Sequence, residues 1–94
     1  MKTKKLVVLG GGESGVGAAI LGKVKGMEVF LSDMGKIAPK YKEALDNANI
    51  KWEEGTHTES MILDADEVVK SPGIPPTAPM MQKIAAKNIP VISE

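Results

Sequence analysis

The chain has 94 residues, no cysteine, and 12 basic against 12 acidic side chains, so its formal net charge is zero. A chain of this length folds as one compact domain that buries roughly 60–65% of its unfolded surface, without needing disulfides or a structural metal. The balanced charge argues against nucleic acid or an anionic membrane as a partner, and every apolar run is far shorter than the roughly 20 residues of a membrane span. We therefore expect a soluble cytoplasmic protein.

Short apolar runs alternate along the chain with longer segments of helical periodicity, a pattern typical of strand–helix–strand units around a parallel sheet. The predicted strands are residues 5–9, 28–32, 51–53, 67–70 and 90–93. The predicted helices between them are residues 14–25, 37–48, 58–63 and 78–87. Short right-handed crossovers then favour a Rossmann-like α/β fold, a doubly wound sheet of five parallel strands in the order 3-2-1-4-5 with about four helices.

The strand order reverses between the first and the fourth predicted strand, residues 5–9 and 67–70. In doubly wound sheets, ligands bind beyond the carboxyl ends of the strands at such a reversal. Two loops are expected to meet there: the glycine-rich loop after the first strand, and the turn Ser71-Pro72-Gly73 after the fourth. The topology therefore predicts a ligand site between these loops.

The glycine-rich loop contains the motif G-x-G-x-x-G, formed by Gly10, Gly12 and Gly15 directly after a strand and at the start of a helix. Such a loop turns tightly and aims free N–H groups and the positive end of the helix dipole at a diphosphate, while the Ser14 hydroxyl adds a donor. Glu13 would repel a diphosphate, so we expect it to be a solvated loop residue or a contact to another domain. The plainer alternative is that the glycines only form a tight turn.

Asp33 ends the second predicted strand, about 20 residues after the glycine motif, where an acidic side chain accepts hydrogen bonds from ribose hydroxyls. The alternative is a helix cap or an exposed loop acid. The expected ligand is thus a nucleotide diphosphate or a dinucleotide. Because the motif G-x-x-x-x-G-K-[ST] is absent, the chain is not expected to bind and split ATP itself.

Four other side chains receive plainer interpretations. His57 is the only histidine of the chain and is expected in a surface loop, without a role in catalysis or metal binding. Ser71 has no plausible histidine base beside it, so nucleophilic catalysis is not expected. Met80 and Met81 are expected to fill the core.

Four segments resemble the N-terminal domain of the muramyl ligases: LGGGESG (9–15), LSDMG (31–35), VVKSPGIP (68–75) and KNIPVISE (87–94). The resemblance covers essentially the whole chain and keeps the spacing between elements. It is closest to the members of the family that add D-glutamate to UDP-N-acetylmuramoyl-L-alanine. It implies an ATP-dependent ligase of peptidoglycan synthesis in the bacterial cytoplasm, with UDP-N-acetylmuramoyl-L-alanine as the partner.

The resemblance also implies a division of labour within such a ligase. This chain, residues 1–94, is expected to be a single N-terminal domain that holds the UDP end of the precursor, and to be inactive alone. ATP and Mg²⁺ are expected to act in central and C-terminal domains, into which the family chain continues beyond Glu94, so no cofactor, metal or catalytic residue is expected here. The residues implied for UDP binding are Gly10, Gly12, Glu13, Ser14, Gly15, Asp33, Met34, Ser71, Pro72 and Gly73.

Two other classes of protein remain open on the same residues. The glycine motif and the acidic residue are also typical of the NAD-binding domain of a dehydrogenase, or of a regulatory ligand-sensing domain. A third possibility is a structural or interaction module that binds no nucleotide.

Overall fold

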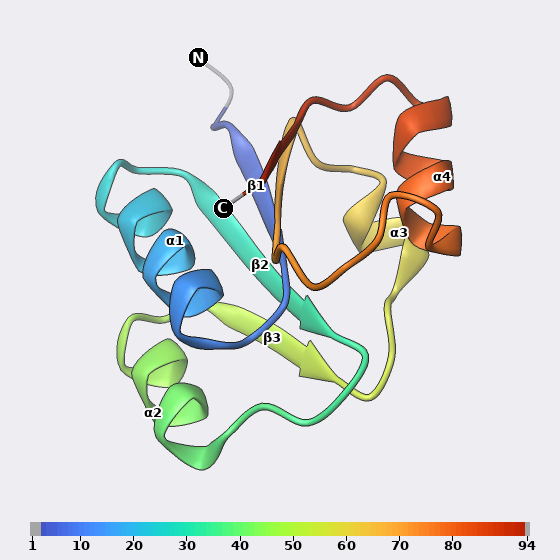
Figure 1. Cartoon of the computed structure of the whole chain (residues 1–94). Helices are drawn as coiled ribbons and strands as arrows, with labels where there is room; N and C mark the ends of the chain where they lie inside the picture. The colour runs from blue at the N-terminus through green and yellow to red at the C-terminus, as the bar shows by residue number, and fades with distance from the viewer. Residues whose placement is uncertain (1–2, 94) are drawn as a thin grey trace.

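Five strands form a single parallel sheet in a computed structural model that describes residues 3–93 (Figure 1). The strands are β1 Lys5–Leu9, β2 Glu28–Asp33, β3 Lys51–Glu54, β4 Glu67–Lys70 and β5 Val91–Ser93. Their order is β3-β2-β1-β4-β5, and each neighbouring pair runs parallel. The predicted doubly wound sheet is therefore confirmed. Glu94, beyond which the chain was expected to continue, lies outside the described residues.

The helices of the described residues cover both faces of this sheet, with α1 and α2 on one face and α3 and α4 on the other (Figure 1). Their bounds are α1 Glu13–Val24, α2 Pro39–Asn47, α3 Glu59–Ile62 and α4 Pro79–Ala86. Each predicted helix is present, with its ends shifted by one or two residues. Both α2 and α4 have a proline in their first turn, where its fixed φ and missing N–H suit a helix start.

The sheet is buried on both faces because its central strand is apolar on both. Leu6 and Val8 of β1 point into the core beneath α1 and α2, while Val7 and Leu9 point into the core beneath α3 and α4. All four side chains are at most 4% exposed. This is the pattern expected of an inner strand in a parallel sheet, and the strand order places β1 in the middle of the sheet.

The first turn of α1 packs against the loop that leads into it. At Gly15, a Cβ would lie 1.9 Å from the carbonyl oxygen of Gly10 and 3.4 Å from a methyl group of Val8. No residue with a side chain fits at such a distance from a backbone atom. The third glycine of the motif therefore allows α1 to pack closely on the loop, which holds the amino end of α1 at the end of β1.

Candidate functional site

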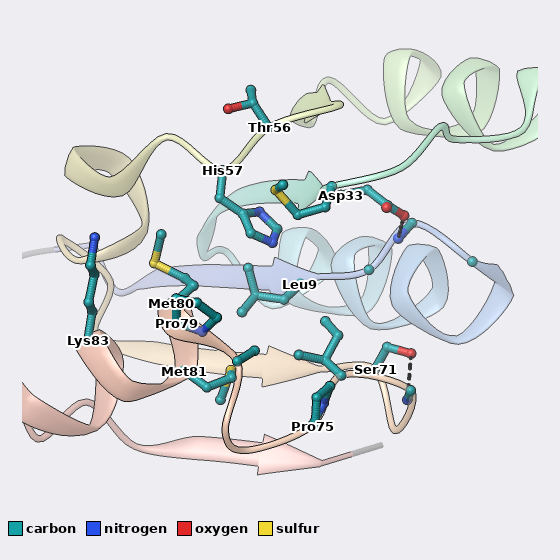
Figure 2. Close-up of a pocket in the computed structure, with 17 residues that line it drawn as sticks. Leu9, Asp33, Thr56, His57, Ser71, Pro75, Pro79, Met80, Met81 and Lys83 are labelled. Atoms are coloured by element: carbon teal, nitrogen blue, oxygen red, sulfur yellow. Dashed lines mark hydrogen bonds between the residues drawn. The ribbon is translucent and has the colours of Figure 1, made fainter.

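A cavity of about 570 Å³ opens at the carboxyl edge of the sheet, where the strand order reverses (Figure 2). Leu9 and the three glycines that follow it form its floor. One wall comes from the loops after β2 and β3, and the opposite wall from the turn after β4 and from α4. The cavity thus lies where the topology predicts a ligand site.

Six of the ten residues implied for UDP binding line this cavity, namely Gly10, Gly12, Asp33, Met34, Ser71 and Gly73. The other four do not belong to its lining. Glu13 and Ser14 are exposed in the first turn of α1, Gly15 is buried under that turn, and Pro72 is exposed in the turn after β4. The cavity therefore unites residues from three separate loops, while the amino end of α1 opens beside it.

Backbone hydrogen bonds and one steric requirement hold the glycine loop against its neighbours. The N–H of Gly10 donates to the carbonyl oxygen of Ser32 (2.9 Å), and the N–H of Ser71 donates to the carbonyl oxygen of Leu9 (2.9 Å). Gly10 has a φ of 110°, and a Cβ there would lie 2.8 Å from the Cβ of Ser71. Only glycine meets both conditions without strain, so the predicted contact between the two loops is present.

The amino end of α1 is free of side-chain caps within residues 3–93. Gly12 is the N-cap residue, and its carbonyl oxygen accepts the first helical hydrogen bond from the N–H of Val16 (2.9 Å). The preceding N–H groups of the first turn have no intrahelical partner, and the positive end of the helix dipole lies with them. Such an end favours an anion. Glu13 is solvated as predicted, but it is the first residue of the helix rather than a loop residue, because Gly12 already has the extended N-cap conformation.

Asp33 has a structural function that the sequence motif did not reveal. One of its carboxylate oxygens accepts a hydrogen bond from the N–H of Gly11 (2.8 Å; Figure 2). The other accepts one from the N–H of Gly35 (2.8 Å). The side chain therefore ties the glycine loop to the loop after β2. Each oxygen has capacity for a second hydrogen bond, so the carboxylate also fits the predicted ribose contact.

We expect the substitution Asp33→Asn to destabilise the chain by about 1–3 kcal/mol, because an amide nitrogen cannot accept from a backbone N–H and leaves one donor without its partner. Urea unfolding followed by circular dichroism measures this difference. Asp46→Asn is a matched control, since the carboxylate of Asp46 accepts only from the indole of Trp52 among the described residues and belongs to α2 rather than to the glycine loop. Equal loss in both variants would contradict the structural function assigned to Asp33.

His57 lies in the loop after β3, as predicted, but it is only partly exposed and faces the cavity. Its ring is half-buried, lines the cavity, and contacts the fully buried Ser32 through Nδ1. Burial lowers the pKa of His57, and the negative charges of Glu53 and Asp33 offset only part of that effect. The neutral form of the ring therefore predominates at pH 7. The available signal was Ser32, a hydroxyl directly after the apolar residues 29–31 of β2, because a polar side chain that becomes buried needs a hydrogen-bond partner.

The wall opposite His57 is largely apolar. Met81 is buried in the core as predicted, and Met80 is partly buried; both also line the cavity. Lys83 brings a cation to the rim and pairs with Glu59 of α3 at 2.8 Å. The cavity thus has a polar floor of backbone amides between a polar wall and an apolar one.

The described residues do not match a site for ATP or Mg²⁺. Among residues 3–93, no three His, Asp or Glu side chains gather closely enough to hold a metal ion, and the sequence has no G-x-x-x-x-G-K-[ST] loop for ATP phosphates. Nor does this part of the chain contain a helix with the length and apolarity that crossing a bilayer requires.

The parallel sheet, the glycine-rich loop and the open amino end of α1 define a Rossmann-like domain. Within that class, residues 5–80 match the family described as the MurD N-terminal domain. The chain belongs to this family, the N-terminal domain of Mur ligases. The family expected from the sequence is confirmed.

Relatives of known name agree with this membership. The chain is 62% identical over 91 residues to a UDP-N-acetylmuramoylalanine--D-glutamate ligase of Bacteroides thetaiotaomicron, a match that covers 97% of this chain and 20% of the relative. The chain therefore spans about a fifth of the length of that relative. A pseudomurein peptide ligase type C from Methanothermus fervidus is similar in structure, with a TM-score of 0.83 at 30% identity over 97% of this chain and 19% of that protein.

A more distant structural likeness concerns the fold alone. Malate dehydrogenase of Cryptosporidium parvum has a TM-score of 0.54 at 20% identity, over 79% of this chain and 26% of that protein. The fold by itself therefore does not separate a ligase domain from a dehydrogenase domain. Sequence identity and the family match make that distinction.

Proposed function

We propose that this chain holds the UDP end of UDP-N-acetylmuramoyl-L-alanine in an ATP-dependent ligase that adds D-glutamate to this precursor during bacterial peptidoglycan synthesis. Membership of the MurD N-terminal domain family supports the proposal, as does the identity with the named relative. The observation that carries it is the uncapped amino end of α1 beside a cavity of about 570 Å³.

In the proposed complex, the diphosphate lies at the amino end of α1. The N–H groups of Gly12, Glu13 and Ser14 donate to its oxygens, with the hydroxyl of Ser14 as a further donor, and the helix dipole favours the negative charge. Gly12 has open space where a Cβ would stand, so the phosphates reach the backbone without obstruction. The exposed carboxylate of Glu13 turns to water and away from the phosphates.

The uridine then extends across the cavity. Its ribose lies near Asp33, whose carboxylate oxygens each have a free acceptor site. The uracil ring lies between Met34 and the turn Ser71–Gly73, within reach of the apolar wall of α4. Gly10 and Gly15 contribute through the shape of the loop rather than through contacts with the ligand.

We further propose that residues 1–94 form one N-terminal domain and that ATP, Mg²⁺ and the chemistry of amide-bond formation belong to central and C-terminal domains. The named relative is about five times longer than the match, which leaves length for such domains. The composition and charge suit an enzyme of the bacterial cytoplasm. This chain alone is expected to bind the precursor without turning it over.

Calorimetric titrations with UDP-N-acetylmuramoyl-L-alanine, UDP and NADH test this function. We expect the first two ligands to bind and to compete with each other, and NADH to bind more weakly. Tighter binding of NADH would reject the proposal in favour of a dehydrogenase or ligand-sensing domain. Silence with all three ligands would favour a structural or interaction module.

A further inference from the structure

Three polar side chains form a connected cluster in which His57 lines the cavity, while Ser32 of β2 and Glu53 of β3 lie behind it. The hydroxyl oxygen of Ser32 lies 2.6 Å from Nδ1 of His57 and 2.7 Å from a carboxylate oxygen of Glu53. It also lies 3.1 Å from the carbonyl oxygen of Thr56. The proposed binding of UDP assigns no function to this cluster.

The position of each proton in the cluster follows from the chemistry of its members. Glu53 also accepts hydrogen bonds from the N–H and the hydroxyl of Thr58. Partial burial raises the pKa of Glu53, but these hydrogen bonds and the one from Ser32 together have a larger, opposite effect. The pKa of Glu53 therefore lies below its ordinary value. An ionised carboxylate only accepts. The single proton of the Ser32 hydroxyl is therefore donated to Glu53, and the contact with His57 requires a proton on Nδ1.

A neutral histidine with its proton on Nδ1 has an acceptor lone pair on Nε2. Within residues 3–93, the only hydrogen bond of His57 is the one through Nδ1. The described residues contain no fully buried side-chain nitrogen or oxygen without a partner, so Nε2 is accessible to solvent. The ring lines the cavity and points into it (Figure 2). The wall therefore presents an acceptor that is held in one tautomer.

We infer that His57 contacts the bound nucleotide directly. Its Nε2 accepts a hydrogen bond from the N3–H of the uracil or from a ribose hydroxyl. The inference rests on the proposed function and adds a specificity contact to it. Ser32 and Glu53 act through His57, because together they keep its proton on Nδ1. A ligand that offers only acceptors at this position is disfavoured, since two lone pairs then face each other.

The surroundings of the ring determine how this contact depends on pH. The negative charges that act on His57 are Glu53 of β3 and Asp33 of β2. The other elements around the cavity contribute the apolar Leu9 of β1 and the cation Lys83 of α4, which is paired with Glu59. The pKa of His57 lies below its ordinary value of 6.5. The acceptor is thus present at neutral pH and is lost as the pH falls through the pKa, so affinity for UDP is expected to decrease only in the acidic range.

The tautomer is testable without any ligand, because His57 is the only histidine of the chain. Long-range ¹H–¹⁵N correlation spectra of the free protein are expected to show a protonated Nδ1 and an unprotonated Nε2 at pH 7. In Ser32→Ala, the hydroxyl that accepts from Nδ1 is removed, so Nδ1–H loses its partner and the proton is expected to shift toward Nε2. A wild-type spectrum with the proton on Nε2 would overturn the inference.

Two substitutions separate a ligand contact from a structural function of the ring. In His57→Gln, the amide group reaches the position of Nε2 and keeps an acceptor there; in His57→Asn, it replaces Nδ1 and keeps only the bond to Ser32. We expect the Asn variant to bind UDP roughly threefold to tenfold more weakly than wild type, the usual effect of one hydrogen bond. The Gln variant is expected to lie close to wild type. If His57→Asn kept its affinity for UDP while His57→Gln lost it, the inference would be overturned.

Nucleotide analogues identify the donor group. Calorimetric titrations compare UDP with its N3-methyl and 2′,3′-dideoxy forms in wild type and in His57→Asn, and the ¹⁵N signal of Nε2 is followed in the wild type. The donor is the group whose removal makes the two proteins bind equally. If UDP binds but the Nε2 signal stays unchanged, or the difference persists with both analogues, the inference is wrong while the proposed function stands. If UDP fails to bind the wild type, both are wrong.

Discussion

The substitution Gly15→Ala is expected to destabilise the fold by about 3 kcal/mol, which corresponds to a melting temperature roughly 12–24 °C lower for a chain of this size. Its Cβ would stand 1.9 Å from the carbonyl oxygen of Gly10. A backbone atom cannot turn aside as a flexible side chain does, so the loop and the helix must separate. The better helix propensity of alanine, about 1 kcal/mol, recovers only part of this loss.

Gly17→Ala is the matched control for this prediction. Gly17 lies two residues further along the same helix, and a Cβ there meets no heavy atom within 4 Å. Alanine is expected to stabilise the chain at this position by about 0.5–1 kcal/mol, since it only lowers the entropy cost of the helix. Thermal and urea unfolding followed by circular dichroism compare the two variants. Similar stabilities would refute the close approach of α1 to the glycine loop.

Gly12→Val is expected to weaken the binding of UDP and of its sugar-peptide derivative by roughly 100-fold or more, since two or more charge-assisted hydrogen bonds to the phosphates would be lost. The isopropyl group would occupy the space through which the phosphates approach the N–H groups of α1. The fold tolerates the change. Gly12 has a φ of −82° and a ψ of −171°, which suit any residue, and no heavy atom lies within 4 Å of its Cβ position.

Calorimetry measures this loss, and circular dichroism verifies that the variant is folded. Valine is a poorer N-cap residue than glycine, so a stability loss of about 1 kcal/mol is expected and does not by itself abolish binding. Gly17→Ala is again the control, because it alters an open position of the same helix outside the cavity. A folded Gly12→Val protein with unchanged affinity would move the diphosphate away from α1 and refute the proposed site.

Much of the fold could be predicted because local patterns coincide with burial. The run KLVVL (5–9) is apolar on both faces and becomes the central strand, and the spacing of Gly10, Gly12 and Gly15 determines how the chain turns from strand to helix. The exact helix ends could be predicted less well. The N-cap conformation of Gly12 starts α1 at Glu13, one residue before the prediction, and such ends depend on local geometry that composition does not record.

The functional side chains also divide into those that could be predicted from the sequence and those that could not. The glycine motif and Asp33 were recognisable because their spacing is short and their chemistry is local to one strand–helix–strand unit. The hydrogen bonds of Asp33 to Gly11 and Gly35 were not, since a carboxylate at the end of a strand has several possible partners. The place of His57 in the cavity lining was not predicted, because nothing near it in the sequence points to its contact with Ser32, 25 positions earlier.

Local patterns were enough to predict the order of the elements, the two-sided burial of β1 and the glycine loop at the start of α1, because each depends on neighbours within a few residues. The loops that share the cavity, and the nitrogen on which His57 keeps its proton, depend instead on how distant segments pack. Pairing of β2 with β3 places Ser32 opposite Glu53, and a hydroxyl with one proton between a carboxylate and an imidazole fixes the tautomer. Such an arrangement exists only once strands distant in sequence lie side by side.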